Sequence, residues 1–240
     1  MPVKTKKRPV ILSKTEWNFI RMIVPSVLLT AARNGLLTHK HLSSKKTLVK
    51  QLYEHTKKPG LFKEAKKFVG FHTEFIALSV ESWKKRKKEL GVVLLAISIE
   101  QTVNCYYRLL LGTSNLDDAE ITAAIRNLSL DAKLGWFLKL CSGEDFPIRL
   151  KKKLRMISEI RNSIVHYKAQ GSPMDENTGS HDAIEKQIKA LGRLNIQKFF
   201  QEIEWKLFEI TQRTNKDFRL MVKAVTKLKK WSILGFQEEP

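Results

Sequence analysis

The sequence lacks the patterns that mark several common classes of protein. It has two cysteines, Cys105 and Cys141, and no CxxC pair, so it offers neither a disulfide framework nor a zinc site of the usual spacing. It contains no Walker A motif and no GxGxxG, HExxH or GxSxG sequence, the signs of nucleotide binding, zinc proteases and serine hydrolases. We therefore expect no metal and no cofactor, and two cysteines that are small core residues in a reducing compartment.

Long uninterrupted apolar runs are also missing. The two longest, 20–37 and 92–111, are broken by residues such as Arg21, Pro25 and Glu100. Neither predicts a membrane-spanning helix. The basic start, MPVKTKKRPV, continues into a polar segment rather than an apolar signal core. These features predict a cytoplasmic protein without a membrane partner.

The period-two alternation that is typical of strands is absent over any useful length, whereas helical spacing is present throughout. The sequence therefore predicts an all-α protein, with the five tryptophans packed in its core. Its expected helices cover 15–34, 44–56, 73–112 with a weak point at Gly91, 117–128, 130–141, 146–168, and 196–231 as one or two helices. Loops are expected at 57–60 and 170–182. We predict two parts, a basic helical extension over 1–70 and a helical bundle over 71–240.

Acidic residues are scarce relative to basic ones. The chain has 44 Lys and Arg against 24 Asp and Glu, a net charge of +20, and residues 1–90 hold 21 of the cations against 6 anions. Such a field attracts polyanions, and RNA is the partner we expect. Two basic clusters are the predicted RNA-binding residues: Lys84, Lys85, Arg86, Lys87 and Lys88, and Lys151, Lys152 and Lys153. Solvated helix faces are the alternative interpretation of both clusters.

One short motif carries possible chemistry. Arg161-Asn162-Ser163-Ile164-Val165-His166 resembles the signature of the HEPN superfamily, in which an arginine and a polar residue precede a histidine near the end of a helix. The segments SLDAKLGWFLKL and IRLKKKLRMISEIRN upstream resemble the lysine-bearing helix, loop and motif helix of that family. Glu100 and Asn104 resemble polar positions of its first core helix. The resemblance covers about 75–230.

The resemblance implies a HEPN-type helical bundle that forms a homodimer and cleaves RNA without a metal. Many members are toxins or antiviral effectors, which implies an antitoxin as a possible partner. Others are non-catalytic modules that bind nucleic acid or a nucleotidyltransferase-like protein, and this is the alternative function. Tyr167 follows the motif histidine directly, whereas the toxin branch often has a tyrosine one position later.

Helical geometry places Arg161 in an unusual position. Leu150, Leu154, Ile157, Arg161 and Ile164 share one stripe at spacings of three and four. A guanidinium among apolar residues is costly unless it is paired or faces a partner. His166 lies five residues on, about 140° around an undistorted helix. Two arrangements could bring both groups to one pocket: the helix unwinds near Val165, or two chains share the site.

These residue types suit RNA cleavage, because RNA carries its own 2′-OH nucleophile. The reaction needs a proton acceptor or donor near neutral pH and a cation for the phosphoryl oxygens, which His166 and Arg161 would supply. Asn162 would orient either group. We expect supporting roles for Glu100, Asn104, Glu159 and Tyr167. The alternatives are an arginine that pairs with Glu100 or Glu159 beside a surface histidine, and a basic protein that binds DNA or anionic lipid.

Overall fold

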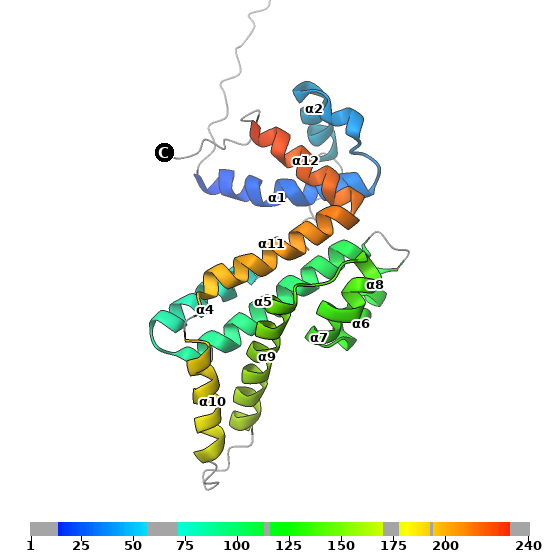
Figure 1. Ribbon diagram of the computed structural model, residues 1–240. Helices are drawn as coiled ribbons and strands as arrows, with labels where there is room; N and C mark the ends of the chain where they lie inside the picture. The colour runs from blue at the N-terminus through cyan, green and yellow to red at the C-terminus, as the bar shows by residue number, and fades with distance from the viewer. Residues whose placement is uncertain (1–13, 57–71, 113–115, 170–177, 193, 231–240) are drawn as a thin grey trace, which may run out of the picture. The chain divides into compact units, whose positions relative to one another are not determined.

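The structure, a computed structural model, describes residues 14–56, 72–112, 116–169, 178–192 and 194–230 (Figure 1). These residues form helices and turns without strands, so the predicted all-α class is confirmed. The helices are α1 Lys14–Arg33, α2 Lys45–Thr56, α4 His72–Lys84, α5 Lys88–Leu111, α6 Asp118–Asn127, α7 Leu130–Ala132, α8 Leu138–Ser142, α9 Ile148–Ala169, α10 Thr178–Ala190, α11 Ile196–Thr214 and α12 Lys216–Lys230. A short 3₁₀ helix spans His39–Leu42.

The chain divides into two compact units, one formed by 1–69 together with 217–240, and the other by 70–216. The sequence-based division also starts its second part near residue 70, but it assigns the C-terminal segment to the bundle. In the first unit, Lys227 of α12 donates a hydrogen bond from Nζ to the carbonyl oxygen of Leu42, at 2.6 Å. An amphipathic helix such as α12 has an apolar face that any complementary face can cover, so its sequence does not reveal its neighbours.

Helix α5 is the central element of the unit 70–216. It packs against α4, α9 and α11 (Figure 1), and its buried residues include Leu95, Ile99 and Val103. By length and hydropathy alone α5 could cross a membrane, and 50% of its most apolar window is buried inside the fold. A helix that is apolar on most sides is typical of a core.

The break between α4 and α5 falls at residues 85–87, and not at Gly91 as the sequence predicts. Arg86 has a positive φ of 60°, which reverses the chain there. Gly91 lies inside α5, where a Cβ atom would be 3.2 Å from the ring of Trp83. Its backbone oxygen accepts a hydrogen bond of 2.7 Å from Ser79. The glycine therefore allows α4 and α5 to approach closely rather than ending a helix.

The expected helix 130–141 contains an irregular segment. Residues Lys133–Phe137 form a π-helical turn, and Gly135 has non-helical angles of φ −114° and ψ −118°. Tyr107 of α5 donates a hydrogen bond to the carbonyl oxygen of Lys133, and its ring stacks on Phe137 with 5.0 Å between the centroids. The π turn is therefore tied to the core helix.

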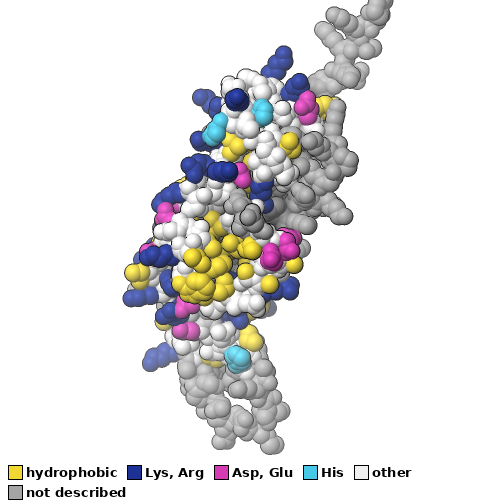
Figure 2. Space-filling view, turned by 90° about the vertical axis from the view of Figure 1, so that its right-hand side faces the viewer, with side chains coloured by type: hydrophobic (Ala, Val, Ile, Leu, Met, Phe, Trp, Pro, Cys, Tyr) yellow, Lys and Arg dark blue, Asp and Glu magenta, His cyan; other side chains and the backbone are white. Residues whose placement is uncertain are grey.

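Two other expectations were wrong. The segment 170–182 was expected to be a loop, but α10 already begins at Thr178, with Ile184 and Ile188 buried at helical spacing. Trp136 and Trp205 are 60% and 62% exposed, so they are not core residues. Figure 2 views the side on which α6, α7 and α8 lie in Figure 1, and it shows apolar side chains gathered on that surface. The side chains of Trp17 and Trp231 lie outside the described residues.

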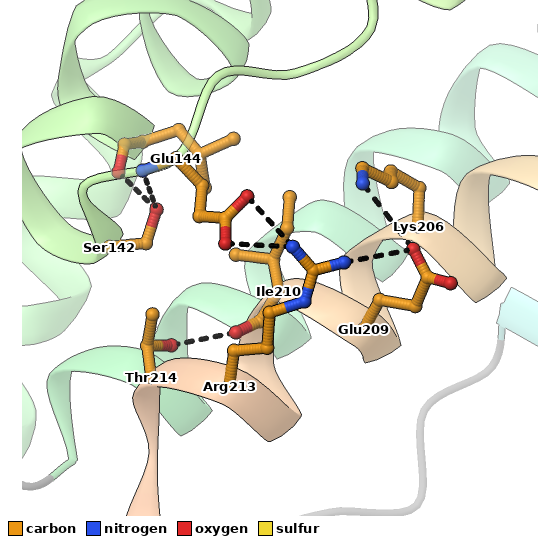
Figure 3. A network of polar contacts seen from close by, with 8 residues as sticks. Ser142, Glu144, Lys206, Glu209, Ile210, Arg213 and Thr214 are labelled. Carbon is orange, nitrogen blue, oxygen red and sulfur yellow. Dashed lines mark hydrogen bonds and ion pairs between the residues drawn. The ribbon is translucent and has the colours of Figure 1, made fainter.

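A polar network fastens the turn after α8 to α11 (Figure 3). Arg213 donates to Glu144 at 3.0 Å and also pairs with Glu209 at 3.6 Å. Lys206 reaches the same Glu209 carboxylate at 3.3 Å. Because α8 ends at Gly143 with φ +70°, the chain turns there and carries Glu144 towards α11. This network helps to fix the start of the segment that leads into α9.

Candidate functional site

A cleft in the unit 70–216 contains much of the chemistry that the sequence indicates. It has a volume of about 380 Å³ and lies between α5, the start of α7 and one face of α9. Its polar lining residues are Glu100, Ser129, Asp131, Lys151, Arg155, Ser158, Glu159, Arg161 and Asn162. Several residues chosen from separate parts of the sequence therefore meet in one place.

Arg161 is held in this cleft by Glu100. Its Nη2 donates to Glu100 Oε2 at 3.2 Å, and the two side chains are 34% and 41% exposed. Arg161 Nε is buried and has no hydrogen-bond partner among the described residues. Ile157, Ile160 and Ile164 around it are all buried. The ion pair with Glu100 therefore explains how a guanidinium can lie on this apolar stripe. A buried donor without a partner is costly, so the guanidinium is only partly satisfied by Glu100.

The structure separates His166 from Arg161 within one chain. Helix α9 continues through Val165 and ends at Ala169, so the first of the two arrangements, a helix that unwinds near Val165, does not occur. His166 is exposed and does not line the cleft. Asn162 and Glu159 are exposed and do line it. Tyr167 belongs to α9, but its side chain lies outside the described residues. Within one chain the structure matches the alternative of an arginine paired with Glu100 beside a surface histidine. A site with both Arg161 and His166 would need two chains.

The other cations of the cleft differ in their pairing. Arg155 donates to Asp131, and this hydrogen bond and charge raise the pKa of Arg155. Lys151 has no hydrogen bond or ion pair from its ammonium to another described residue, and a Cβ atom at Gly135 would be 2.8 Å from that ammonium. The glycine leaves room for Lys151 at the edge of the cleft. Lys151 is thus a cation available to an incoming anion.

Sequence reasoning missed Lys133, a buried residue that precedes Leu134 of the cleft lining. Its side chain is 2% exposed, and its Nζ donates to Oδ1 of Asn104 at 2.8 Å. Burial lowers the pKa of Lys133, and the nearby Glu100 carboxylate acts in the opposite direction. A signal existed in the sequence, because Leu130, Lys133, Leu134, Phe137 and Leu138 share helical spacing. Lys133 thus interrupts an apolar stripe as Arg161 does.

The two predicted RNA-binding clusters do not each form one patch. Lys85 pairs with Glu81 at 2.6 Å. Arg86, Lys87 and Lys88 line a second hollow of about 480 Å³, which Lys189 of α10 also lines. In the other cluster, Lys151 lies in the cleft, Lys152 is exposed, and Lys153 is 5.8 Å from the ring centroid of Phe199. Lys151, Lys152 and Lys153 are consecutive residues of α9 and point 100° apart, so these three do not share one surface.

The comparisons with known proteins give no relative: no protein-family model, curated protein or solved structure matches the chain. In the described part of the chain, no three His, Cys, Asp or Glu side chains are grouped as metal ligands would be. Both cysteines are free and half-buried.

Proposed function

We propose that this protein is a HEPN-type endoribonuclease that cleaves RNA through its own 2′-OH, with Arg161 and His166 contributed to each site by two copies of the chain. The observation that carries the proposal is the cleft itself, which gathers Arg161 and Asn162 of the motif with Glu100 and the cation of Lys151. Arg161 and Asn162 belong to α9 and Glu100 belongs to α5, and the family resemblance names all three. Their meeting supports the interpretation of the motif as a site rather than a chance string.

The cleft would hold the phosphate through its cations. Arg161, whose side chain is 34% exposed, and Lys151, which has no partner among the described residues, both lie along the lining. The guanidinium would stabilise the charge on the phosphoryl oxygens as the 2′-oxygen attacks the phosphorus and the 5′-oxygen leaves. His166 of the second copy would take the 2′-OH proton or give one to the leaving 5′-oxygen. Asn162, exposed next to Arg161 in the cleft lining, would orient the phosphate.

The basic residues outside the cleft would extend the contact along the RNA. Arg86, Lys87, Lys88 and Lys189 converge on the second hollow, and Lys84 is exposed beside them. Phosphate contacts of this kind supply affinity without reading sequence.

The test is cleavage of labelled RNA by the purified protein in EDTA. Arg161→Ala and His166→Ala should each abolish cleavage, and Asn162→Ala should reduce it in part. Arg149→Ala and His39→Ala are matched controls, because Arg149 is exposed and paired with Glu202 and His39 is exposed in the other unit. Full activity in Arg161→Ala or His166→Ala, or equal losses in the controls, would contradict the proposal.

A second candidate function is RNA binding without cleavage. It is favoured by two observations, the ion pair between Arg161 and Glu100 and the exposure of His166 outside the cleft of its own chain. In that case RNA would bind in EDTA and remain uncut, and only Arg161→Ala would weaken binding.

A further inference from the structure

Two cations approach one face of α5 from different sides. Glu100 and Asn104 are four residues apart, so they occupy neighbouring turns of the same helix face. Arg161 of α9 donates to Glu100 at 3.2 Å, and Lys133 of the π-helical turn donates to Asn104 at 2.8 Å. Asn104 thus holds the Lys133 ammonium one turn of α5 from Glu100, and the Glu100 charge counteracts the lowering of the Lys133 pKa by burial. Glu100 therefore has two cationic neighbours, one in the cleft and one buried.

The two neighbours differ in their freedom to move. Arg161 is 34% exposed at its side chain, whereas Lys133 is 2% exposed. The π turn that carries Lys133 is fixed to α5 by the Tyr107 hydrogen bond. Lys133 therefore stays in place while Arg161 can turn towards a ligand.

An incoming phosphate creates a cost in this arrangement. If Arg161 leaves Glu100 for the phosphate, the carboxylate loses its ion pair. The Glu100 side chain is 41% exposed, so this costs part of what a fully buried charge would lose. A fixed ammonium nearby reduces that cost, because it remains beside the carboxylate after Arg161 has moved. A buried lysine is itself unfavourable, so its presence calls for such a role.

We propose that Lys133 is a positioning residue that serves as the standing counter-ion of Glu100, so that Arg161 can exchange Glu100 for a phosphate group of RNA. The inference rests on the proposed function for the identity of the ligand as RNA. Lys133 does not touch the ligand, and it acts only through Glu100 and Asn104. Its removal should therefore matter only as long as position 100 carries a charge.

This dependence gives a double-mutant cycle with Lys133→Met and Glu100→Gln. The probe is a short 2′-O-methyl RNA, which has the phosphates of RNA but no free 2′-OH and cannot be cut. Binding is measured by fluorescence anisotropy in EDTA. Lys133→Met should raise the Kd about tenfold, equivalent to about 1.4 kcal/mol. In the Glu100→Gln background the same substitution should change the Kd by less than about twofold.

The controls separate positioning from folding. Lys139→Met removes an exposed lysine that pairs with Asp145 and should leave the Kd unchanged. Lys133→Gln is the second variant in case Lys133→Met folds poorly, because glutamine keeps a polar side chain of similar length. Lys133→Gln should raise the Kd as expected for Lys133→Met. An unchanged Kd in Lys133→Gln would overturn the inference. An equal rise in Kd on replacing Lys133 in the parent and in the Glu100→Gln background would overturn it as well.

A second measurement keeps the inference separate from cleavage. The NMR signal of the Arg161 Nε–H group should shift on titration with inorganic phosphate, at a lower concentration in the parent than in Lys133→Gln. A parent that shows this shift and the cycle but leaves unmodified RNA uncut would contradict the proposed catalysis and support the inference. An Arg161 signal that neither phosphate nor the 2′-O-methyl RNA moves would overturn the inference.

Discussion

A mixture of Arg161→Ala and His166→Ala chains should cleave RNA at about one quarter of the parent rate. The reason lies in α9, which remains helical from Ile148 to Ala169. Five residues at 100° each separate Arg161 from His166 by about 140° around the axis. The two groups of one chain therefore point apart, and the proposed site takes Arg161 from one copy and His166 from the other.

The expected rate follows from counting sites in the mixture. Random pairing of the two variants makes about half of the dimers mixed, under two-fold symmetry. Each mixed dimer has one site with both groups intact and one with neither. Because half of the dimers are mixed and half of the sites in each mixed dimer are intact, the mixture should have about one quarter of the parent activity.

The assay is RNA cleavage in EDTA after the two variants have been mixed and allowed to exchange. Chain exchange is verified with differently tagged chains, and each variant alone provides the background. Light scattering establishes the oligomeric state. Failure to regain activity in proven mixed dimers would refute the shared site. A strictly monomeric parent that cleaves RNA would refute it as well.

Three further predictions follow from individual side chains. Burial raises the pKa of Glu204, so the folded state favours its protonated form, and ionisation costs stability as pH rises through the folded pKa. Glu204→Gln should therefore raise the Tm at pH 7 by about 2–4 °C per kcal/mol of stability gained. In melts below about pH 4 the difference in Tm should vanish, because Glu204 is then protonated in both states. A higher Tm of the variant below that pH would contradict the ionisation of Glu204 as its cause. Replacing Lys84, Lys87 and Lys88 with Gln should reduce the slope of log affinity for single-stranded RNA against log salt by about 2, whereas an unchanged slope would identify them as a solvated surface. Ile160 is 0% exposed, and Ile160→Ala should lower the free energy of unfolding by about 2–5 kcal/mol, measured by urea denaturation. Lys152→Ala is the surface control and should change that free energy by less than about 0.5 kcal/mol.

The helical class of the protein could be predicted from local patterns alone. Apolar residues repeat every three or four positions along α9 and α11, and that spacing depends only on the geometry of one helix. The position of Arg161 on such a stripe likewise showed that it needed a partner, because the cost of burying a guanidinium is independent of the rest of the fold. Glu100 could be named as a candidate partner on the same basis.

Only the tertiary structure decided which residues meet. Whether Glu100 or Glu159 pairs with Arg161 depends on how α5 packs against α9, which no local pattern encodes. The burial of Lys133 depends on the π turn and its bond to Tyr107, a contact across 26 residues. The membership of α12 in the first unit depends on which surface covers its apolar face. Helical periodicity is a short-range property of the chain, whereas these contacts arise from the packing of distant segments, where many apolar faces are nearly equivalent.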